Sequence, residues 1–100
     1  MIVYNVPLAI EPSVEEEVIH WLRDIHIPEV METGLFLSSA MFKVFEGPDQ
    51  PHGSYAIQYR LENWDAFQSY SAHHAAALQA KTRDKFGERV LAFRTFLELQ

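Results

Sequence analysis

The sequence contains no cysteine among its 100 residues. Disulfide bonds, thiolate nucleophiles and cysteine-ligated metals are therefore excluded. Basic residues are also scarce, since 8 Lys and Arg stand against 14 Asp and Glu and leave a formal net charge of −6. An acidic chain without a basic stripe argues against nucleic acid as a partner and against an anionic membrane surface.

Long apolar runs and glycine-rich segments are missing as well. No stretch approaches the length of a membrane-spanning helix, and residues 1–10 lack the basic flank of a signal peptide. The chain has no glycine-rich phosphate loop and no nucleophile elbow. We therefore expect a cytoplasmic protein that uses no cofactor. Its 48% hydrophobic content predicts a single compact domain over residues 1–100.

Apolar residues alternate along four segments of the chain and recur at helical spacing along two others. The resulting order, β-α-β-β-α-β, is the ferredoxin-like pattern of an α+β domain, with two helices on one face of a four-stranded antiparallel sheet. Because each strand also carries apolar residues on its other face, a second copy of the sheet is the simplest cover for that face. The expected strands are residues 2–10, 35–46, 54–61 and 89–99, with a loop at residues 47–53, and the expected helices are residues 14–26 and 64–86.

Polar residues mark where both helices are expected to begin. Ser13, followed three residues later by Glu16, has the spacing of a capping box. Asn63 is expected to cap the second helix. The buried face of the first helix is expected to contain Val14, Val18, Trp21, Leu22 and Ile25.

The segment of residues 26–34, with the sequence HIPEVMETG, predicts a corner between two helical pieces. Pro28 disfavours helical geometry in Ile27, so the first helix is expected to end at His26. Proline is well tolerated at the first position of the helix that follows. Gly34 can adopt the left-handed conformation that ends this short helix.

His26 and Glu29 in this corner are the candidate acid/base pair. A carboxylate close to a histidine stabilises the protonated ring and orients it. The structural alternative is a histidine that satisfies the carbonyl groups at a helix end. Both interpretations favour the protonated ring, so we expect the pKa of His26 to lie above the reference of about 6.5.

Other polar residues within apolar segments are candidates for ligand binding. His74 either points into a pocket or is a core histidine with a hydrogen-bond partner. Tyr4 and Tyr59 either supply hydroxyl groups to an apolar cavity or fill the sheet surface. Arg94 either binds a polar ligand or, as is more typical of arginine, pairs with a carboxylate such as Glu98 at an interface.

No metal site is expected from the histidine pattern. His73 and His74 are adjacent on a helix, so they do not readily share one metal ion. The stripe formed by Glu16, His20 and Asp24 is more typical of a solvated helix face.

Several segments carry a resemblance to a known family. They are residues 2–6, the corner at residues 26–34, residues 55–59 and the end from residue 86 to residue 95. Over nearly its whole length the chain resembles a small bacterial domain family without an assigned function. More broadly, it is similar to the dimeric α/β-barrel superfamily, in which two ferredoxin-like subunits pack sheet to sheet. That superfamily includes cofactor-independent monooxygenases, sugar mutarotases, lactone isomerases, haem-degrading enzymes and non-catalytic proteins.

Two functional hypotheses follow. The first is a homodimeric small-molecule binding or accessory protein with a small apolar or aromatic ligand, which dimerises through the sheet face that carries Asn5, Gln58 and Arg60. The alternative is a cofactor-independent isomerase or monooxygenase that uses His26 as an acid/base. An enzyme requires a closed cavity in which His26 or His74 meets tyrosine hydroxyls, whereas a binding or structural protein would show a filled core with those histidines paired to backbone or solvent.

Overall fold

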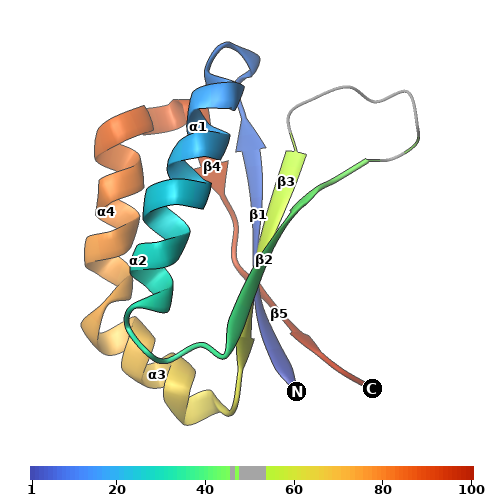
Figure 1. The fold of residues 1–100 in the computed structure, drawn as a ribbon. Helices are drawn as coiled ribbons and strands as arrows, with labels where there is room; N and C mark the ends of the chain where they lie inside the picture. The colour runs from blue at the N-terminus through green and yellow to red at the C-terminus, as the bar shows by residue number, and fades with distance from the viewer. Residues whose placement is uncertain (46, 48–53) are drawn as a thin grey trace.

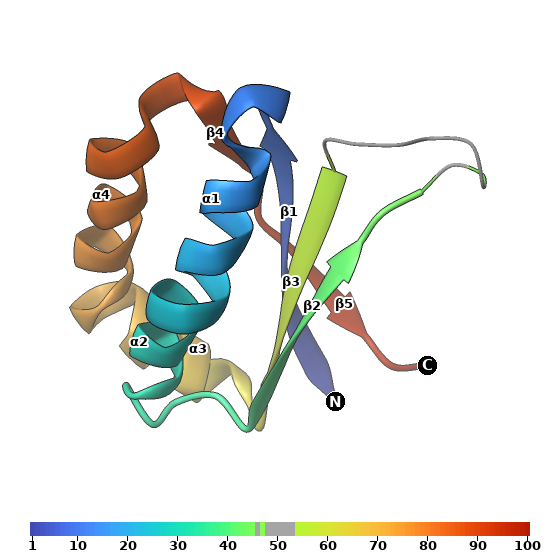
Figure 2. The same ribbon diagram turned by 45° about the horizontal axis from the view of Figure 1, so that its top comes forward.

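The computed structural model describes residues 1–45, 47 and 54–100. One antiparallel sheet is covered on one face by helices (Figure 1), and a second view shows all helices on that same face (Figure 2). The expected loop at residues 47–53 lies outside the described residues, apart from Gly47. The strands are β1 Ile2–Ile10, β2 Ser38–Lys43, β3 Ser54–Leu61, β4 Val90–Ala92 and β5 Thr95–Glu98, and the helices are α1 Glu15–Trp21, α2 Ile27–Met31, α3 Trp64–His73 and α4 Ala75–Phe86.

The sheet confirms the predicted α+β, ferredoxin-like fold. Its strand order is β2-β3-β1-β4, and β5 also pairs with β1. Tyr4 on β1 lies opposite Tyr59 on β3 and opposite Phe96 on β5. The alternation predicted for the first strand is confirmed, because its inward residues are all buried: Ile2, Tyr4, Val6, Leu8 and Ile10.

The first helix does not end at His26, so the predicted corner is wrong. Ile27 is helical, with φ −60° and ψ −45°, and its N–H bonds to the carbonyl of Leu22. A π turn at Leu22–His26 therefore joins α1 directly to α2. Pro28 clashes with the preceding turn of a regular α-helix and lacks an N–H. The wider π turn accommodates it without breaking the helix.

This extra residue changes which side chains face the sheet. Ile25, expected in the buried face, is 48% exposed, whereas His26 is half-buried. Val14, Val18, Trp21 and Leu22 precede or begin the π turn and are buried as predicted.

The two predicted helix caps have different outcomes. The side chain of Asn63 accepts a hydrogen bond from the N–H of Ala66 at 2.9 Å, as predicted. The capping box is wrong, because a 3-10 turn at Pro12–Val14 precedes α1 and no side chain caps that helix. Ser13 instead donates a hydrogen bond to Glu11 at 3.0 Å.

Three other elements differ from their predicted bounds. The second strand is shorter than residues 35–46. The second helix is divided at His74, whose φ of −131° and ψ of −35° are not helical. The fourth strand is split into β4 and β5. The N–H of Phe93 between them still bonds to the carbonyl of Pro7 at 2.9 Å, so the strand bends while staying attached to β1.

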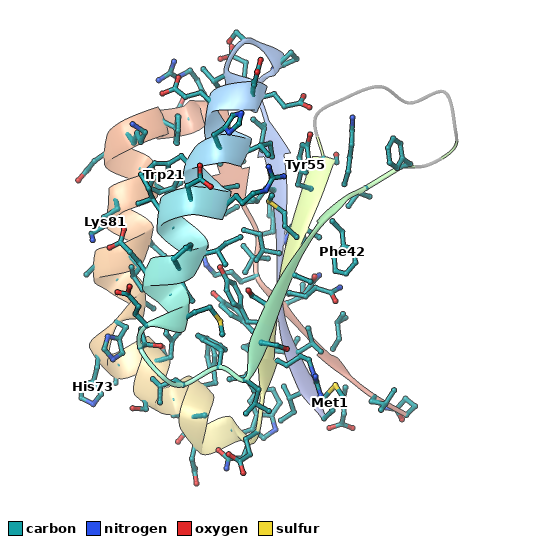
Figure 3. All side chains as sticks on the ribbon, viewed as in Figure 1. Met1, Trp21, Phe42, Tyr55, His73 and Lys81 are labelled. Atoms are coloured by element: carbon teal, nitrogen blue, oxygen red, sulfur yellow. The ribbon has the colours of Figure 1, made fainter. Side chains whose placement is uncertain are left out.

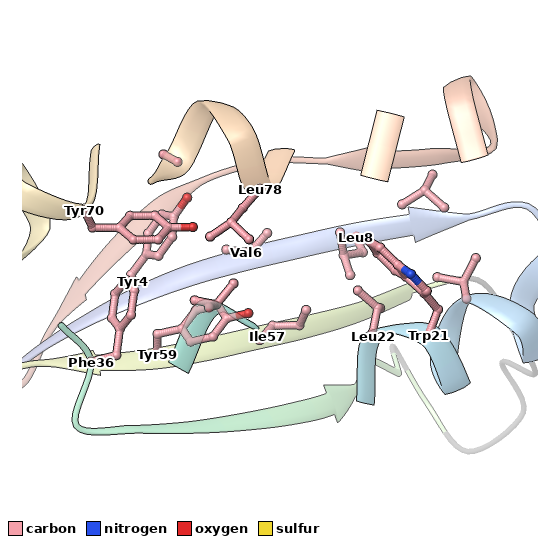
Figure 4. Packing of buried hydrophobic residues seen from close by; sticks show 14 of the residues in the cluster. Tyr4, Val6, Leu8, Trp21, Leu22, Phe36, Ile57, Tyr59, Tyr70 and Leu78 are labelled. Carbon is pink, nitrogen blue, oxygen red and sulfur yellow. The ribbon is translucent and has the colours of Figure 1, made fainter. Parts of the chain in front are cut away.

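The core lies between the helices and the sheet (Figure 4). Leu22, Leu61, Val18 and Val30 are its largest fully buried side chains. No helix in the described part of the chain has both the length and the apolar character needed to cross a membrane.

Gly34 adopts the predicted left-handed conformation, with φ 77°. A Cβ at this position would meet no atom within 4 Å, so any cost of substitution comes from the backbone. We expect Gly34→Val to lower the free energy of unfolding by about 1–3 kcal/mol, measured by urea denaturation. Asn tolerates left-handed geometry better, so Gly34→Asn should cost less, and an unchanged midpoint for the valine variant would contradict the prediction.

Candidate functional site

A small internal cavity lies between the sheet and the helices, with a volume of about 40 Å³. Aliphatic side chains from β1, β3 and the helices, such as Val6, Leu22 and Ile57, form much of its wall. Polar side chains also converge on it from six different segments of the fold. They are Tyr4, His26, Tyr59, Tyr70, Gln79 and Arg94.

Three tyrosines line the cavity and belong to one aromatic cluster. The ring of Tyr4 lies 6.0 Å from that of Tyr59 and 6.1 Å from that of Tyr70, measured between centroids. In the close-up view the Tyr59 and Tyr70 rings extend in the same direction along the sheet (Figure 4). The structure therefore brings together Tyr4 and Tyr59, which the sequence proposed as cavity residues.

Burial keeps the three phenols neutral. Desolvation raises the pKa of Tyr4, although the neighbouring Arg94 opposes this effect. Burial raises the pKa of Tyr70 to about 12 and the pKa of Tyr59 further still. The hydroxyl of Tyr59 is buried and has no hydrogen-bond partner among the described residues.

His26 reaches the cavity because the π turn rotates it inward. Its ring stacks on Trp21 with centroids 4.9 Å apart and planes 20° apart. Its Nδ1 atom is buried and has no hydrogen-bond partner in the described part of the chain. Desolvation lowers the pKa of His26; Glu29 opposes this shift, and Lys81 and Arg94 add to it. The expected rise in this pKa is therefore wrong, because burial outweighs the nearby carboxylate.

Glu29 lies apart from the cavity. Its carboxylate forms an ion pair with Lys81, which ties α2 to α4 at the surface. Glu29 still acts on His26 through its charge, but it does not contribute to the cavity wall. An acid/base role for this pair stays a prediction.

Arg94 follows β4 and reaches from solvent to the cavity wall. Its positive charge lies close enough to the Tyr4 hydroxyl to oppose the rise in the pKa of that group. The ion pair expected at an interface, with a carboxylate such as Glu98, stays a prediction; the ion pairs among the described residues are Lys81–Glu29 and Lys85–Glu17. The register with β1 is the same on both sides of the bend, since Leu8 lies opposite Ala92 and Tyr4 lies opposite Phe96. Arg94 and Glu98 therefore lie on the same face of the sheet as Tyr4 and Leu8.

His74 does not reach the cavity. It lies at the break between α3 and α4, half-exposed, and stacks on Tyr70 with centroids 6.4 Å apart. Gln79 on α4 does line the cavity, and sequence reasoning missed it. A single glutamine beside the apolar Leu78 gives no pattern from which a cavity residue is recognised.

An open groove continues from the cavity between α4 and β4, with a volume of about 490 Å³. Gln79, Ala92 and Arg94 line both spaces, so they stand at the junction between groove and cavity. The described residues contain no group of three His, Asp or Glu side chains that could hold a metal ion. The site instead offers phenol hydroxyls, an amide, a neutral imidazole and one guanidinium.

Comparison with known proteins shows what the chain is similar to. The family model described as Domain of unknown function (DUF4286) matches residues 1–100. No curated protein matches the chain.

Solved structures with this fold share little sequence with the chain. An ethyl tert-butyl ether d (EthD) family protein from Bacillus halodurans has a TM-score of 0.75 at 13% identity, over 100% of both chains. An antibiotic biosynthesis monooxygenase has a TM-score of 0.69 at 15% identity, over 100% of this chain and 99% of the other. MhuD with two manganese protoporphyrin IX molecules bound per active site has a TM-score of 0.69 at 17% identity, over 99% of this chain and 94% of the other. Likeness at these identities establishes the fold alone.

We expect the ring of His26 to titrate with a pKa below about 6.5, because burial disfavours its charged form. Glu29→Gln should lower this pKa further, since the Glu29 charge favours the protonated ring. NMR titration of the ring protons measures both values. Glu16→Gln, which removes an exposed carboxylate from the preceding helix, serves as the charge-matched control.

The same shift has a consequence for stability. Because the folded pKa lies below the unfolded value, the contribution of the neutral ring is fully present above pH ~6.5 and is lost as pH falls through the folded pKa. The free energy of unfolding should therefore fall more steeply with acidification in the wild type than in His26→Gln. Equal slopes in the two proteins, or a ring pKa above the reference, would rule out a desolvated His26.

Proposed function

Because the chain belongs to the family described as Domain of unknown function (DUF4286), we propose its function from the site itself. We infer a homodimeric small-molecule binding or accessory protein, whose ligand occupies the cavity and the groove that opens from it. A pocket with a few convergent polar groups and perturbed titratable residues is the default binding-site hypothesis.

The observation that carries this proposal is the pair of unpartnered polar atoms. The Tyr59 hydroxyl and the His26 Nδ1 atom are buried without a hydrogen-bond partner among the described residues. Leaving a buried polar group unpaired costs about 1–3 kcal/mol. Both groups line one cavity, so a single ligand that contacts both would recover this cost.

The surroundings favour an apolar or aromatic ligand body. Ring faces of Tyr4, Tyr59 and Tyr70 contribute to the cavity wall, and Val90, Leu91 and Ala92 contribute to the groove. The groove volume of about 490 Å³ falls within the range of small-molecule sites.

The outer face of the sheet supports a dimer. Phe42 points away from the helices (Figure 3) and is 49% exposed. Leu97, which lies opposite Val3, is 44% exposed, and Leu91 is 51% exposed. Asn5 on the same face has a buried side-chain oxygen without a partner among the described residues. A second copy packed on this face would cover the apolar side chains and offer Asn5 a partner.

A second candidate function is a cofactor-independent isomerase or monooxygenase that uses His26 as an acid/base. The observation in its favour is that burial holds His26 neutral with a free Nδ1 in the cavity wall, the state a general base requires. Turnover of a bound compound separates the two functions. An enzyme would convert the compound and lose this turnover in His26→Gln, whereas a binding protein would show no turnover and His26→Gln would change its affinity alone.

We expect a homodimer at micromolar concentration, measured by sedimentation velocity. Leu97→Asp places a charge on the outer sheet face and should shift the protein to monomer. Ile25→Asp, at an equally exposed apolar position on the helical side, should leave the dimer intact. A wild-type monomer, or equal effects of the two substitutions, would rule out this interface.

We also expect planar aromatic compounds with one polar head, such as benzamide or benzoate, to bind between α4 and β4. Their addition should shift the NMR signals of His26, Tyr59 and Ala92, but not those of Phe42. Ala92→Leu fills the junction of groove and cavity and should weaken binding about fivefold or more, since overpacked sites tolerate little added volume. Ala77→Leu, the same change at an exposed position of α4, should have no effect. Failure of both compounds to shift these signals would contradict the proposed function.

A further inference from the structure

We propose that the ligand is a carboxylate, whose anionic head is bound by the guanidinium of Arg94 where the groove meets the cavity. This inference rests on the proposed function and assigns the chemical class of the ligand to the same site.

The charge balance of the site favours an anion. Arg94 is the one charged side chain among the described residues that line the cavity, and no Asp or Glu lines it. The three tyrosines stay neutral, because the pKa of each lies above its usual value. They therefore offer hydroxyl donors rather than phenolate charges. The nearby Glu29 forms an ion pair with Lys81 outside the cavity. The cavity therefore keeps the positive charge of Arg94 within an acidic protein.

Arg94 also has unused hydrogen-bonding capacity. Its charge acts on the neutral Tyr4 hydroxyl, and no ion pair joins it to a carboxylate among the described residues. A guanidinium carries five N–H donors, arranged as a planar fork that matches the two oxygens of a carboxylate. Water reaches the exposed part of Arg94, but an anion in the cavity would form two charge-assisted hydrogen bonds with this fork, which are stronger than those to a neutral acceptor.

The dimensions of the two spaces agree with a flat anionic head on a larger body. A cavity needs a volume of about 10–15 Å³ to hold one water molecule. The cavity volume of about 40 Å³ therefore has room for roughly three such groups, which matches the three heavy atoms of a carboxylate. The groove of about 490 Å³ offers room for the remainder of the ligand. Gln79 lines the same junction as Arg94, and its amide N–H groups are further donors for an anion.

The test compares benzoate with benzamide, which has nearly the same shape and no charge. Affinities are measured by NMR titration of the wild type, Arg94→Met and Arg83→Met. Arg83 lines the groove but not the cavity, so its substitution removes the same charge nearby without removing the proposed anchor. We expect wild-type protein to bind benzoate at least tenfold more tightly than benzamide, since charge-assisted hydrogen bonds contribute about that factor or more.

Arg94→Met should abolish this preference, because benzoate loses its charged partner and benzamide loses much less. An unchanged NMR spectrum of core residues such as Leu22 and Leu61 would show that the variant is folded. Arg83→Met should retain most of the preference. Equal affinities for the two compounds in the wild type would overturn the carboxylate proposal and leave the binding function standing. An equal loss of the benzoate preference in Arg94→Met and Arg83→Met would also overturn the carboxylate proposal. Such a result would indicate general electrostatic attraction and no specific contact with Arg94. Absence of binding by either compound would overturn the binding function itself, and this inference with it.

Discussion

The central position of β1 is the constraint on which the rest of this structure depends. It pairs with β3 on one side and with β4 and β5 on the other, and its inward residues are buried from Ile2 to Ile10. Shifting its register by one residue would expose this entire set. With that register fixed, Tyr4 lies between Tyr59 and Phe96, and an aromatic cluster forms that contributes Tyr4, Tyr59 and Tyr70 to the cavity wall.

The π turn is the second determinant of the site, and it acts through helical phase. One extra residue in the turn places Ile25 in solvent and brings His26 inward against Trp21. A regular helix would have placed Ile25 in the core and His26 at the edge of the buried face. Such turns are found frequently at functional sites. Here the turn accommodates Pro28 and supplies the cavity with its imidazole.

The site combines a positive junction with an apolar interior, and this combination explains its titration behaviour. Burial dominates the pKa of each cavity tyrosine and of His26, so neutral forms are retained. Arg94 extends to solvent at one end, and its guanidinium is the one charged group among the described residues that line the cavity. In the proposed binding function, a polar ligand head would therefore meet one cation and several neutral groups.

The strand periodicity and the cap at Asn63 could be predicted from the sequence because they depend on neighbours within a few residues. The ferredoxin-like order and the left-handed Gly34 followed from the same local rules. The sequence also identified Tyr4, Tyr59, His26 and Arg94 as candidates, since each is a polar group in an apolar context. Only the tertiary structure decided that these residues line one cavity, that Glu29 forms an ion pair with Lys81, and that Gln79 also lines the cavity. The sign of the His26 pKa shift also required it, because desolvation and charge depend on residues far apart in the chain that the fold brings together.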